Sequence, residues 1–334
     1  MRVVAAPDKL RGTATSLEVA AAVARAAATA GWTCDQRPMA DGGEGTLDAF
    51  GGPNRTTVVT GPLCDPVAAQ WRLSPSVAVI EMAQASGLHL VGGPDGNDPV
   101  AAATHGTGEL IATAVEAGAR RVLVGVGGSA TTDGGLGALR ALSPHPRLRG
   151  VELVVACDVR TTFFDAAATY GPQKGATPAQ VELLRRRLER LAQVYEEDHG
   201  IDVRDLKGSG AAGGLAGGLA ALGADLVAGF DVISEELGLD EVLEGADLVI
   251  TTEGFLDAQS FEGKVVGGVA ALAAELGVPA LAVAGQVFDG VGARIPAISL
   301  TDRFGEDRAR AETLRCIEAV VTDHLRSGGP ITTR

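Results

Sequence analysis

The sequence predicts an α/β protein with mainly parallel sheets and enough residues for two domains. Short apolar runs typical of buried strands alternate with helix-like runs along almost the whole chain. With 334 residues, 46% of them hydrophobic, the chain can bury a large core, and this length favours two domains over one. The 46 glycines gather in short clusters between the apolar runs without a strict period, so we assign them to loops.

The individual elements follow from apolar runs and helix caps. Residues 2–6 form a strand-like run, and Thr15-Ser-Leu-Glu18 has the spacing of a capping box that begins an alanine-rich helix ending at Gly31. Short apolar runs bounded by turn residues predict further strands at 78–82, 122–126, 153–157, 248–251 and 280–284. Helix-like runs predict helices at 108–117, 135–142, 178–198, 264–276 and 307–325.

Composition excludes several classes of function. A net charge of −14 and a pI near 4.8 argue against binding to nucleic acid or to an anionic membrane surface, since both need a basic surface. The four cysteines form no C-x-x-C pair, which argues against a zinc site and a disulfide framework. The N-terminus lacks a signal-peptide pattern, and the longest uncharged stretch, 208–224, is too weakly apolar to span a bilayer. We therefore expect a soluble cytoplasmic protein.

The most informative stretch is residues 38–46, Pro-Met-Ala-Asp-Gly-Gly-Glu-Gly-Thr, which sets Asp41 and Glu44 among three glycines. Glycine permits positive φ and the close approach of a ligand, and carboxylates supply the oxygens that magnesium or a hydroxyl group binds. Segments 125–135, 208–214 and 251–257 have the same character. A chain with several such glycine-rich polar loops is expected to surround a polyanion with backbone amides. This expectation points to phosphate chemistry.

Two of the glycine segments have competing interpretations. In 125–135 an apolar strand runs into glycines, hydroxyl residues and Asp133 before a helix, an order that suits an anion at a helix N-terminus and equally suits a turn with Asp133 as N-cap. In 208–214 the spacing G-x-G-x-x-G matches a dinucleotide-binding fingerprint, but the preceding residues do not form a convincing strand. The chain has no Walker P-loop.

Charged residues near the predicted strand ends are candidates for the chemistry. Asp158 follows the strand at 153–157, where it could act as a catalytic carboxylate or cap a turn. Lys174 lies between proline and glycine, a setting in which a lysine is ordinarily a surface residue. Glu253, Asp257 and Lys264 combine two oxygen ligands and an ammonium group in one strand-loop-helix unit, as metal-assisted phosphoryl transfer requires. The histidines show no metal-ligand spacing.

In their fixed order these motifs resemble the bacterial type I glycerate kinase family, from residue 2 to about residue 287. The family's P-M-A-D-G-G-E-G-T is present unchanged at 38–46, and its opening A-P-D-S-F-K-G-S appears as Ala6-Pro-Asp-Lys-Leu-Arg-Gly-Thr13. Further family motifs match at 80–88, 106–111, 127–135, 157–159, 171–176, 210–214 and 247–264.

The resemblance implies an activity and an architecture. The implied reaction is ATP-dependent, magnesium-assisted phosphorylation of D-glycerate, with the 2-hydroxyl favoured over the 3-hydroxyl as the site of transfer. The implied architecture is a flavodoxin-like domain from residues 1–65 and 225–334, with a second α/β domain inserted at 66–224 and the active site in the cleft between them. The expected partners are D-glycerate and ATP, without nucleic acid or membrane. The oligomeric state is not fixed, and a homodimer is one candidate.

The resemblance also implies roles for individual residues. Expected catalytic residues are Asp158, which would accept or orient the hydroxyl proton, and Lys264 and Asp41. Expected substrate-binding residues are Asp8, Arg11, Asp41, Gly42, Gly43, Glu44, Lys174 and Asp257. Expected nucleotide-binding residues are Gly127, Gly128, Ser129, Thr131, Asp133, Gly210, Gly213, Gly214 and Glu253. The magnesium ligands are expected to be Asp133 and Glu253.

Departures from the family pattern leave two alternatives open. The usual C-D-V-x-N-P-L reads Cys157-Asp-Val-Arg-Thr-Thr-Phe163, the basic residue of R-N-P is lost at 96–99, and Arg11 replaces a lysine. A kinase for another small hydroxy acid, such as tartronate or a branched glycerate analogue, is therefore one alternative. The other is a dinucleotide-binding protein without kinase activity, which the glycines of 208–213 would favour.

Overall fold

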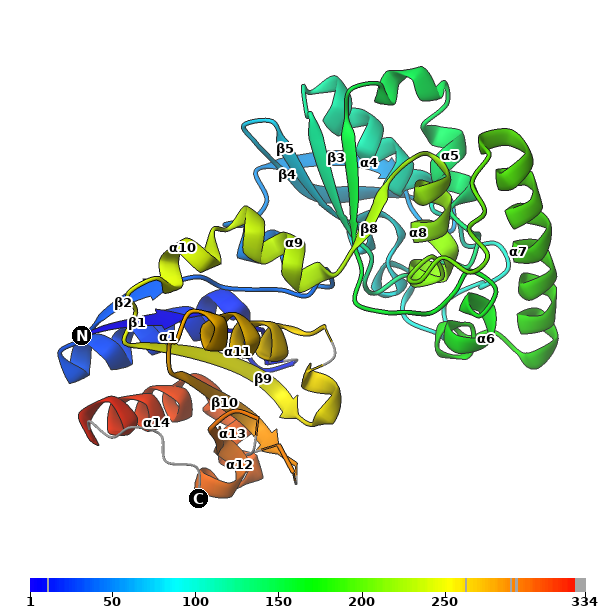
Figure 1. The fold of residues 1–334 in the computed structure, drawn as a ribbon. Helices are drawn as coiled ribbons and strands as arrows, with labels where there is room; N and C mark the ends of the chain where they lie inside the picture. Colours follow the sequence, from blue (N-terminus) through cyan, green and yellow to red (C-terminus); the bar gives the residue numbers. More distant parts are fainter. Residues whose placement is uncertain (11, 262, 289, 292–293, 328–334) are drawn as a thin grey trace. The chain divides into compact units, whose positions relative to one another are not determined.

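The computed structural model describes residues 1–10, 12–261, 263–288, 290–291 and 294–327 (Figure 1). The chain divides into two compact units. Unit 1 comprises residues 1–41, 48–50 and 230–334, and unit 2 comprises residues 42–47 and 51–229. Unit 1 is thus built from both ends of the chain. The domain limits expected after residues 65 and 224 stay a prediction.

The sheet of unit 1 has five parallel strands. They are β1 (Arg2–Ala5), β2 (Thr33–Gln36), β9 (Leu248–Leu256), β10 (Ala280–Val287) and β11 (Ala297–Ser299). Their order in the sheet is β11-β10-β9-β1-β2, and every neighbouring pair is parallel. Counted along the chain within this unit, the order is 2-1-3-4-5, which is that of flavodoxin-like folds. The predicted fold class is confirmed.

Helices cover both faces of this sheet. They are α1 (Ser16–Ala30), α10 (Leu239–Leu243), α11 (Val265–Glu275), α12 (Leu300–Phe304), α13 (Glu306–Ala311) and α14 (Thr313–Ser327), with α9 (Gly229–Glu236) where the chain enters the unit. On β10, Leu281 and Val283 are in a cluster with residues of α1 and α14, whereas Ala282 and Ala284 pack with Val266 of α11. This alternation is that of a strand buried on both faces.

Two predictions for helices of unit 1 had different outcomes. The capping box of α1 is present, with Thr15 and Glu18 bonded reciprocally and Gly31 ending the helix at φ 80°. The single helix predicted at 307–325 is wrong, because α13 and α14 are separate and Glu312 between them has φ −123° and ψ 35°. The Thr313 hydroxyl donates to the carbonyls of Ala309 and Arg310, a side-chain bond that competes with regular helix geometry.

The sheet of unit 2 has six strands in the order β3-β4-β5-β6-β7-β8. They are β3 (Arg55–Thr60), β4 (Pro66–Ser74), β5 (Val77–Glu81), β6 (Arg121–Gly125), β7 (Glu152–Ala156) and β8 (Asp225–Val227). The strands β5 to β8 are parallel, and β3, β4 and β5 pair antiparallel. The apolar runs did not reveal β3 and β4, because most of their residues are exposed or half-buried and polar residues interrupt the pattern.

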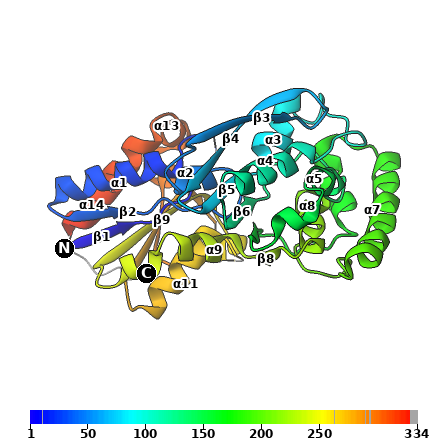
Figure 2. The ribbon, with the colours of Figure 1, turned by 90° about the horizontal axis from the view of Figure 1, so that it is seen from above.

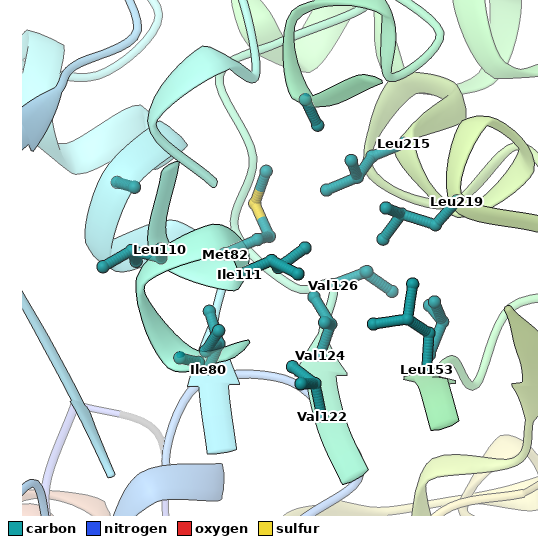
Figure 3. Packing of buried hydrophobic residues seen from close by; sticks show 14 of the residues in the cluster. Ile80, Met82, Leu110, Ile111, Val122, Val124, Val126, Leu153, Leu215 and Leu219 are labelled. Carbon is teal, nitrogen blue, oxygen red and sulfur yellow. The ribbon is translucent and has the colours of Figure 1, made fainter. Parts of the chain in front are cut away.

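The core of unit 2 lies between its sheet and a layer of helices. These are α3 (Ala83–Ser86), α4 (His105–Glu116), α5 (Leu136–Ala141) and α8 (Ala211–Ala221), with α6 (Ala166–Tyr170) and α7 (Pro178–His199) farther from the sheet. Figure 3 shows Ile80 and Val124 of the sheet facing Ile111 of α4 and Leu215 and Leu219 of α8. Figure 2 shows α8 between the sheet of unit 2 and α7. The helix predicted at 178–198 is α7, which ends one residue later.

The remaining helical segments are short. They are α2 (Thr46–Ala49) and the 3-10 turns η1 (Leu88–Val91), η2 (His145–Leu148), η3 (Pro172–Lys174) and η4 (Ala258–Phe261). Over the part of the chain that the structure describes, no helix combines the length and the apolar character needed to cross a membrane.

Candidate active site

The strand order of unit 1 changes direction between β1 and β9, and ligands of such sheets bind beyond the carboxyl ends of the strands at this point. Asp8 follows β1 here. Its backbone N–H donates to the carbonyl of Thr252 on β9 at 3.3 Å, and its carbonyl accepts the Thr252 hydroxyl at 2.7 Å. The predicted residue Glu253 comes next on β9, so the sheet itself places Asp8 near Glu253.

Lys264 and Glu253 form an ion pair in unit 1. Lys264 Nζ lies 2.9 Å from Glu253 Oε1, and the Glu253 side chain is only 12% exposed. Burial alone would lower the pKa of Lys264, but the hydrogen bond with Glu253 and the nearby carboxylates of Asp257 and Asp41 outweigh it, so the pKa lies above its ordinary value. Lys264 is also the N-cap residue of α11, where the helix dipole favours an anion.

The carboxylate of Asp8, also in unit 1, has a raised pKa. Burial, followed by the charge of Asp41, raises the pKa of Asp8 to about 7, although Lys9 acts in the opposite direction. Asp8 Oδ1 accepts the N–H of Lys9 at 2.7 Å. Asp8, Asp41, Glu253 and Lys264 therefore interact electrostatically in one place.

Asp257 and Arg11 are two further residues of unit 1 that were expected to bind the substrate. Asp257 Oδ1 accepts the N–H groups of Gln259 and Ser260 at 2.8 and 3.2 Å, so this carboxylate shapes the turn that leads to Lys264. Arg11, expected to bind the substrate, lies outside the described residues.

In unit 2 the glycines of 42–44 lie directly against the carboxyl ends of the strands. A Cβ on Gly42, which has φ 84°, would be 2.7 Å from the carbonyl oxygen of Ala156 at the end of β7. A Cβ on Gly125 would be 2.6 Å from the carbonyl oxygen of Gly42, and one on Gly127 would be 2.7 Å from the Cα of Gly43. This close backbone packing explains why the stretch needs glycines, and it leaves Glu44 exposed.

Asp158 follows β7, as the sequence predicted. Its Oδ1 accepts the N–H of Gly229 at 2.9 Å, and Gly229 is the last residue of unit 2 before the chain enters unit 1. One carboxylate oxygen therefore holds the backbone. This bond agrees with the turn-capping interpretation and does not test the catalytic one.

The glycine loop 125–135 is only partly accessible. Gly128 is exposed and Gly127 is half-buried, whereas Ser129, Thr131 and Thr132 are buried. The hydroxyl oxygens of Thr131 and Thr132 have no hydrogen-bond partner within the described ranges. Of the predicted nucleotide-binding residues in this loop, the two glycines are the ones that a ligand can reach most directly.

Asp133 is held by four hydrogen bonds. Its Oδ2 accepts the backbone N–H and the hydroxyl of Thr104 at 2.9 and 2.8 Å and the N–H of Gly137 at 3.0 Å, while Oδ1 accepts the N–H of Gly135 at 3.2 Å. Sequence reasoning missed Thr104. No local pattern marks this residue, because its contact with Asp133 is long-range.

The residues expected to hold magnesium differ in how well they suit it. Glu253 Oε2 is buried and has no hydrogen-bond partner among the residues described, and the Glu253 carboxylate interacts electrostatically with Asp8 of the same unit. Such an oxygen suits a hard cation, whereas the oxygens of Asp133 already accept four donors. The described residues contain no ready group of three histidine, cysteine or acidic side chains for a metal ion. The fit therefore favours Glu253 over Asp133.

The loop 210–214 packs against the glycine loop 125–135. Ala212, Gly213 and Gly214 are left-handed, and a Cβ on Gly213 would lie 2.0 Å from the carbonyl oxygen of Thr131. The N–H of Gly134 donates to the Gly213 carbonyl at 3.0 Å. Gly210 is equally confined, since its Cβ would lie 2.2 Å from a carbonyl oxygen. These glycines therefore join two loops.

The G-x-G-x-x-G spacing lacks the context of a dinucleotide-binding turn. Residues 200–209 are all described, and none of them lies in a strand. A dinucleotide-binding turn would connect a strand directly to a helix. The structure gives this alternative no support.

Lys174 is a buried residue rather than a surface lysine. Its side chain lies inside unit 2, with the residue 2% exposed, and Nζ donates to the carbonyl of Thr131 at 2.6 Å. Burial lowers the pKa of Lys174 to about 7, and the charge of Asp133 opposes this shift. The substrate contact expected for Lys174 stays a prediction.

Most of the chain matches a single protein family. The family model described as the glycerate kinase family matches residues 3–145 and 143–305. The chain belongs to the glycerate kinase family. This membership confirms the predicted family and the prediction that the chain is an enzyme of the glycerate kinase type.

Individual members of the glycerate kinase family are similar over most of their length. The glycerate kinase of Bacillus subtilis is 40% identical over 327 residues, covering 86% of this chain and 85% of that protein. The glycerate 2-kinase of Escherichia coli is 38% identical over 332 residues, covering 87% of each. The crystal structure of a proposed glycerate kinase 2 from Salmonella typhimurium LT2 superimposes with a TM-score of 0.83 at 35% identity, covering 98% of this chain and 99% of that one.

Proposed function

We propose that the chain transfers a phosphoryl group from ATP to D-glycerate and that the product is 2-phosphoglycerate. Family membership supports the kinase reaction, and the name of the Escherichia coli relative, glycerate 2-kinase, supports the position of the phosphate. The observation that carries the proposal is the ion pair of Lys264 and Glu253 beside Asp8 and Asp41. It occurs where a flavodoxin-like sheet binds its ligands.

The residues of unit 1 would neutralise the phosphate charge, hold magnesium and bind glycerate. Lys264, at the start of α11, would neutralise the phosphate oxygens, and Glu253 would hold magnesium through its buried Oε2. Magnesium, when bound, supplies charge neutralisation between phosphate oxygens. Asp8, Asp41 and Asp257 would bind glycerate.

The residues of unit 2 would bind the ATP phosphates and accept or orient the proton of the glycerate hydroxyl. The backbone of half-buried Gly127 and exposed Gly128 would bind ATP phosphates, with Ser129 and the loop 210–214 supporting this position. Asp158 would accept or orient the proton of the glycerate hydroxyl, and Gly42, Gly43 and Glu44 would bind the substrate. Because phosphoryl transfer has a loose transition state, positioning and charge neutralisation contribute more than removal of the proton.

The family resemblance also supports a proposal for where the reaction occurs and in which setting the enzyme works. The reaction would occur in a cleft between the two domains. The enzyme would act on small molecules in the cytoplasm without a macromolecular partner, and a homodimer is one candidate for its oligomeric state.

A substrate panel tests the proposal. Purified protein with ATP and magnesium is assayed for ADP release with D-glycerate, L-glycerate, tartronate and a branched glycerate analogue, and phosphorus NMR identifies the product. We expect D-glycerate to give the highest kcat/KM and 2-phosphoglycerate as product. A preference of more than tenfold for tartronate or the branched acid would establish the alternative substrate. ADP release with none of the four would contradict the kinase proposal.

A further inference from the structure

Lys174 makes an internal contact with the buried part of the glycine loop 125–135. Its ammonium donates to the carbonyl oxygen of Thr131 at 2.6 Å, and it lies 6.0 Å from the ring centroid of Tyr170. Because a buried ammonium needs hydrogen-bond acceptors, this contact orients both the side chain and the Thr131 carbonyl. The donor is thus directed at the backbone of the loop.

Asn97 reinforces the same connection. Its Nδ2 donates to the carbonyl of Ala130 at 3.0 Å and to the carbonyl of Lys174 at 2.9 Å. One side-chain amide therefore links the glycine loop to the turn that carries Lys174. Two consecutive carbonyls of the loop therefore accept hydrogen bonds from this pair of side chains, that of Ala130 from Asn97 and that of Thr131 from Lys174.

The loop is also confined on other sides. The backbone of Gly213 closely approaches the Thr131 carbonyl, since a Cβ there would lie 2.0 Å from that oxygen. The carbonyl of Gly128 accepts the N–H of Leu88, and the N–H of Ala130 donates to Ser86, both at 2.9 Å. The buried half of the loop is therefore fixed next to the accessible residues Gly127 and Gly128.

Holding the carbonyls fixes the direction of the amides. In a trans peptide the C=O and the following N–H point in opposite directions. The bonds to Ala130 and Thr131 therefore turn the N–H groups of Thr131 and Thr132 away from Asn97 and Lys174. These fixed peptide groups follow Gly127 and Gly128 in the chain and limit how the accessible backbone of the two glycines can turn.

We propose that Lys174 and Asn97 form a buried clamp that positions the glycine loop for the nucleotide, and that Lys174 does not contact glycerate. This is a positioning role, different from the direct substrate contact that the family resemblance implied for Lys174. The nucleotide part of the inference rests on the proposed function, whereas the clamp itself rests on the contacts within unit 2.

The test compares Lys174→Met and Asn97→Ala with wild type. Lys207→Met is the matched control, since Lys207 is an exposed lysine of the same unit. Hydrogen exchange of the ligand-free full chain is measured by mass spectrometry over residues 127–135. Both clamp variants are expected to exchange at least tenfold faster there, with unchanged exchange in α7, and the control is expected to match wild type. Asn97→Ala keeps the test decisive if Lys174→Met fails to fold.

Binding and kinetics form the second part of the test. The Kd for ATP with magnesium is expected to rise at least fivefold in both clamp variants, while the KM for D-glycerate stays within twofold of wild type. Unchanged exchange in both variants would overturn the clamp, as would a rise in the D-glycerate KM with an unchanged ATP Kd. If wild type binds no ATP, the proposed function fails, and the exchange measurement still decides whether the clamp exists.

Discussion

The ammonium of Lys264 lies 2.9 Å from one carboxylate oxygen of Glu253, and the other oxygen is buried with no hydrogen-bond partner in the described part of the chain. One side chain thus combines a paired and an unpaired oxygen beside two further carboxylates, Asp8 and Asp41. A buried oxygen without a partner costs free energy, so a ligand that satisfies it is stabilised. A cation bound at this oxygen would meet this requirement, as the proposed magnesium role of Glu253 supposes.

Replacing Lys264 by methionine tests the cationic part of this arrangement. Methionine keeps an unbranched side chain and removes the charge, so the transferring phosphoryl group loses an electrostatic partner. We expect kcat/KM for D-glycerate to fall about 10²–10³-fold, the usual effect of removing one such group. Steady-state kinetics measures this, with Lys207→Met as the exposed control. A loss of less than threefold would show that Lys264 does not contact the reacting phosphate.

Replacing Asp158 by asparagine separates its two roles. The amide oxygen can still accept the N–H of Gly229, so the fold around this contact is preserved, but the side chain can no longer take a proton. We expect an unchanged melting temperature and a fall in kcat of about 10²–10⁴-fold if Asp158 is the general base. A loss below tenfold with Lys264→Met inactive would leave Asp158 only a positioning role.

The parts of the fold that sequence could predict are those with a local signal. The capping box at Thr15 and the left-handed cap at Gly31 depend on residues three or four positions apart, and both are present. The continuous apolar runs gave β5, β6 and β7 to within one residue at each end. Half-exposed strands such as β4 have no continuous apolar run, and they were missed.

The site was harder to predict because its contacts are long-range. The sequence around Lys174, proline before it and glycine after it, suggested a surface residue, and only the fold brings Thr131 to its ammonium. Gly128 and Gly213 belong to similar clusters, yet Gly128 is exposed and Gly213 packs against a carbonyl. Glycine clusters therefore indicated which loops come together without distinguishing ligand contact from backbone packing.

Replacing Gly42 by alanine tests the close packing of the loop on β7. A Cβ would lie 2.7 Å from the carbonyl oxygen of Ala156, and φ is 84°. Gly52→Ala is the matched control, because Gly52 has φ 81° with no atom within 4 Å of its Cβ. The control is expected to lose roughly 1–2 kcal/mol of unfolding free energy from backbone strain. Gly42→Ala is expected to lose about 1–3 kcal/mol more from overpacking. Equal losses in urea titrations would contradict the role of close packing at Gly42.

The buried Lys174 predicts how the stability of the protein depends on pH. Its pKa is about 7 in the folded chain and 10.5 ordinarily. Between these values the unfolded chain binds a proton that the folded chain does not, so the unfolding free energy of wild type rises with pH relative to Lys174→Met. The slope of this difference is expected to reach at most about 1.4 kcal/mol per pH unit. Urea unfolding at pH 7, 8, 9 and 10 measures it, and the exposed control Lys207→Met is expected to show no such difference from wild type. Parallel curves for wild type and Lys174→Met would mean that Lys174 keeps its ordinary pKa in the folded chain.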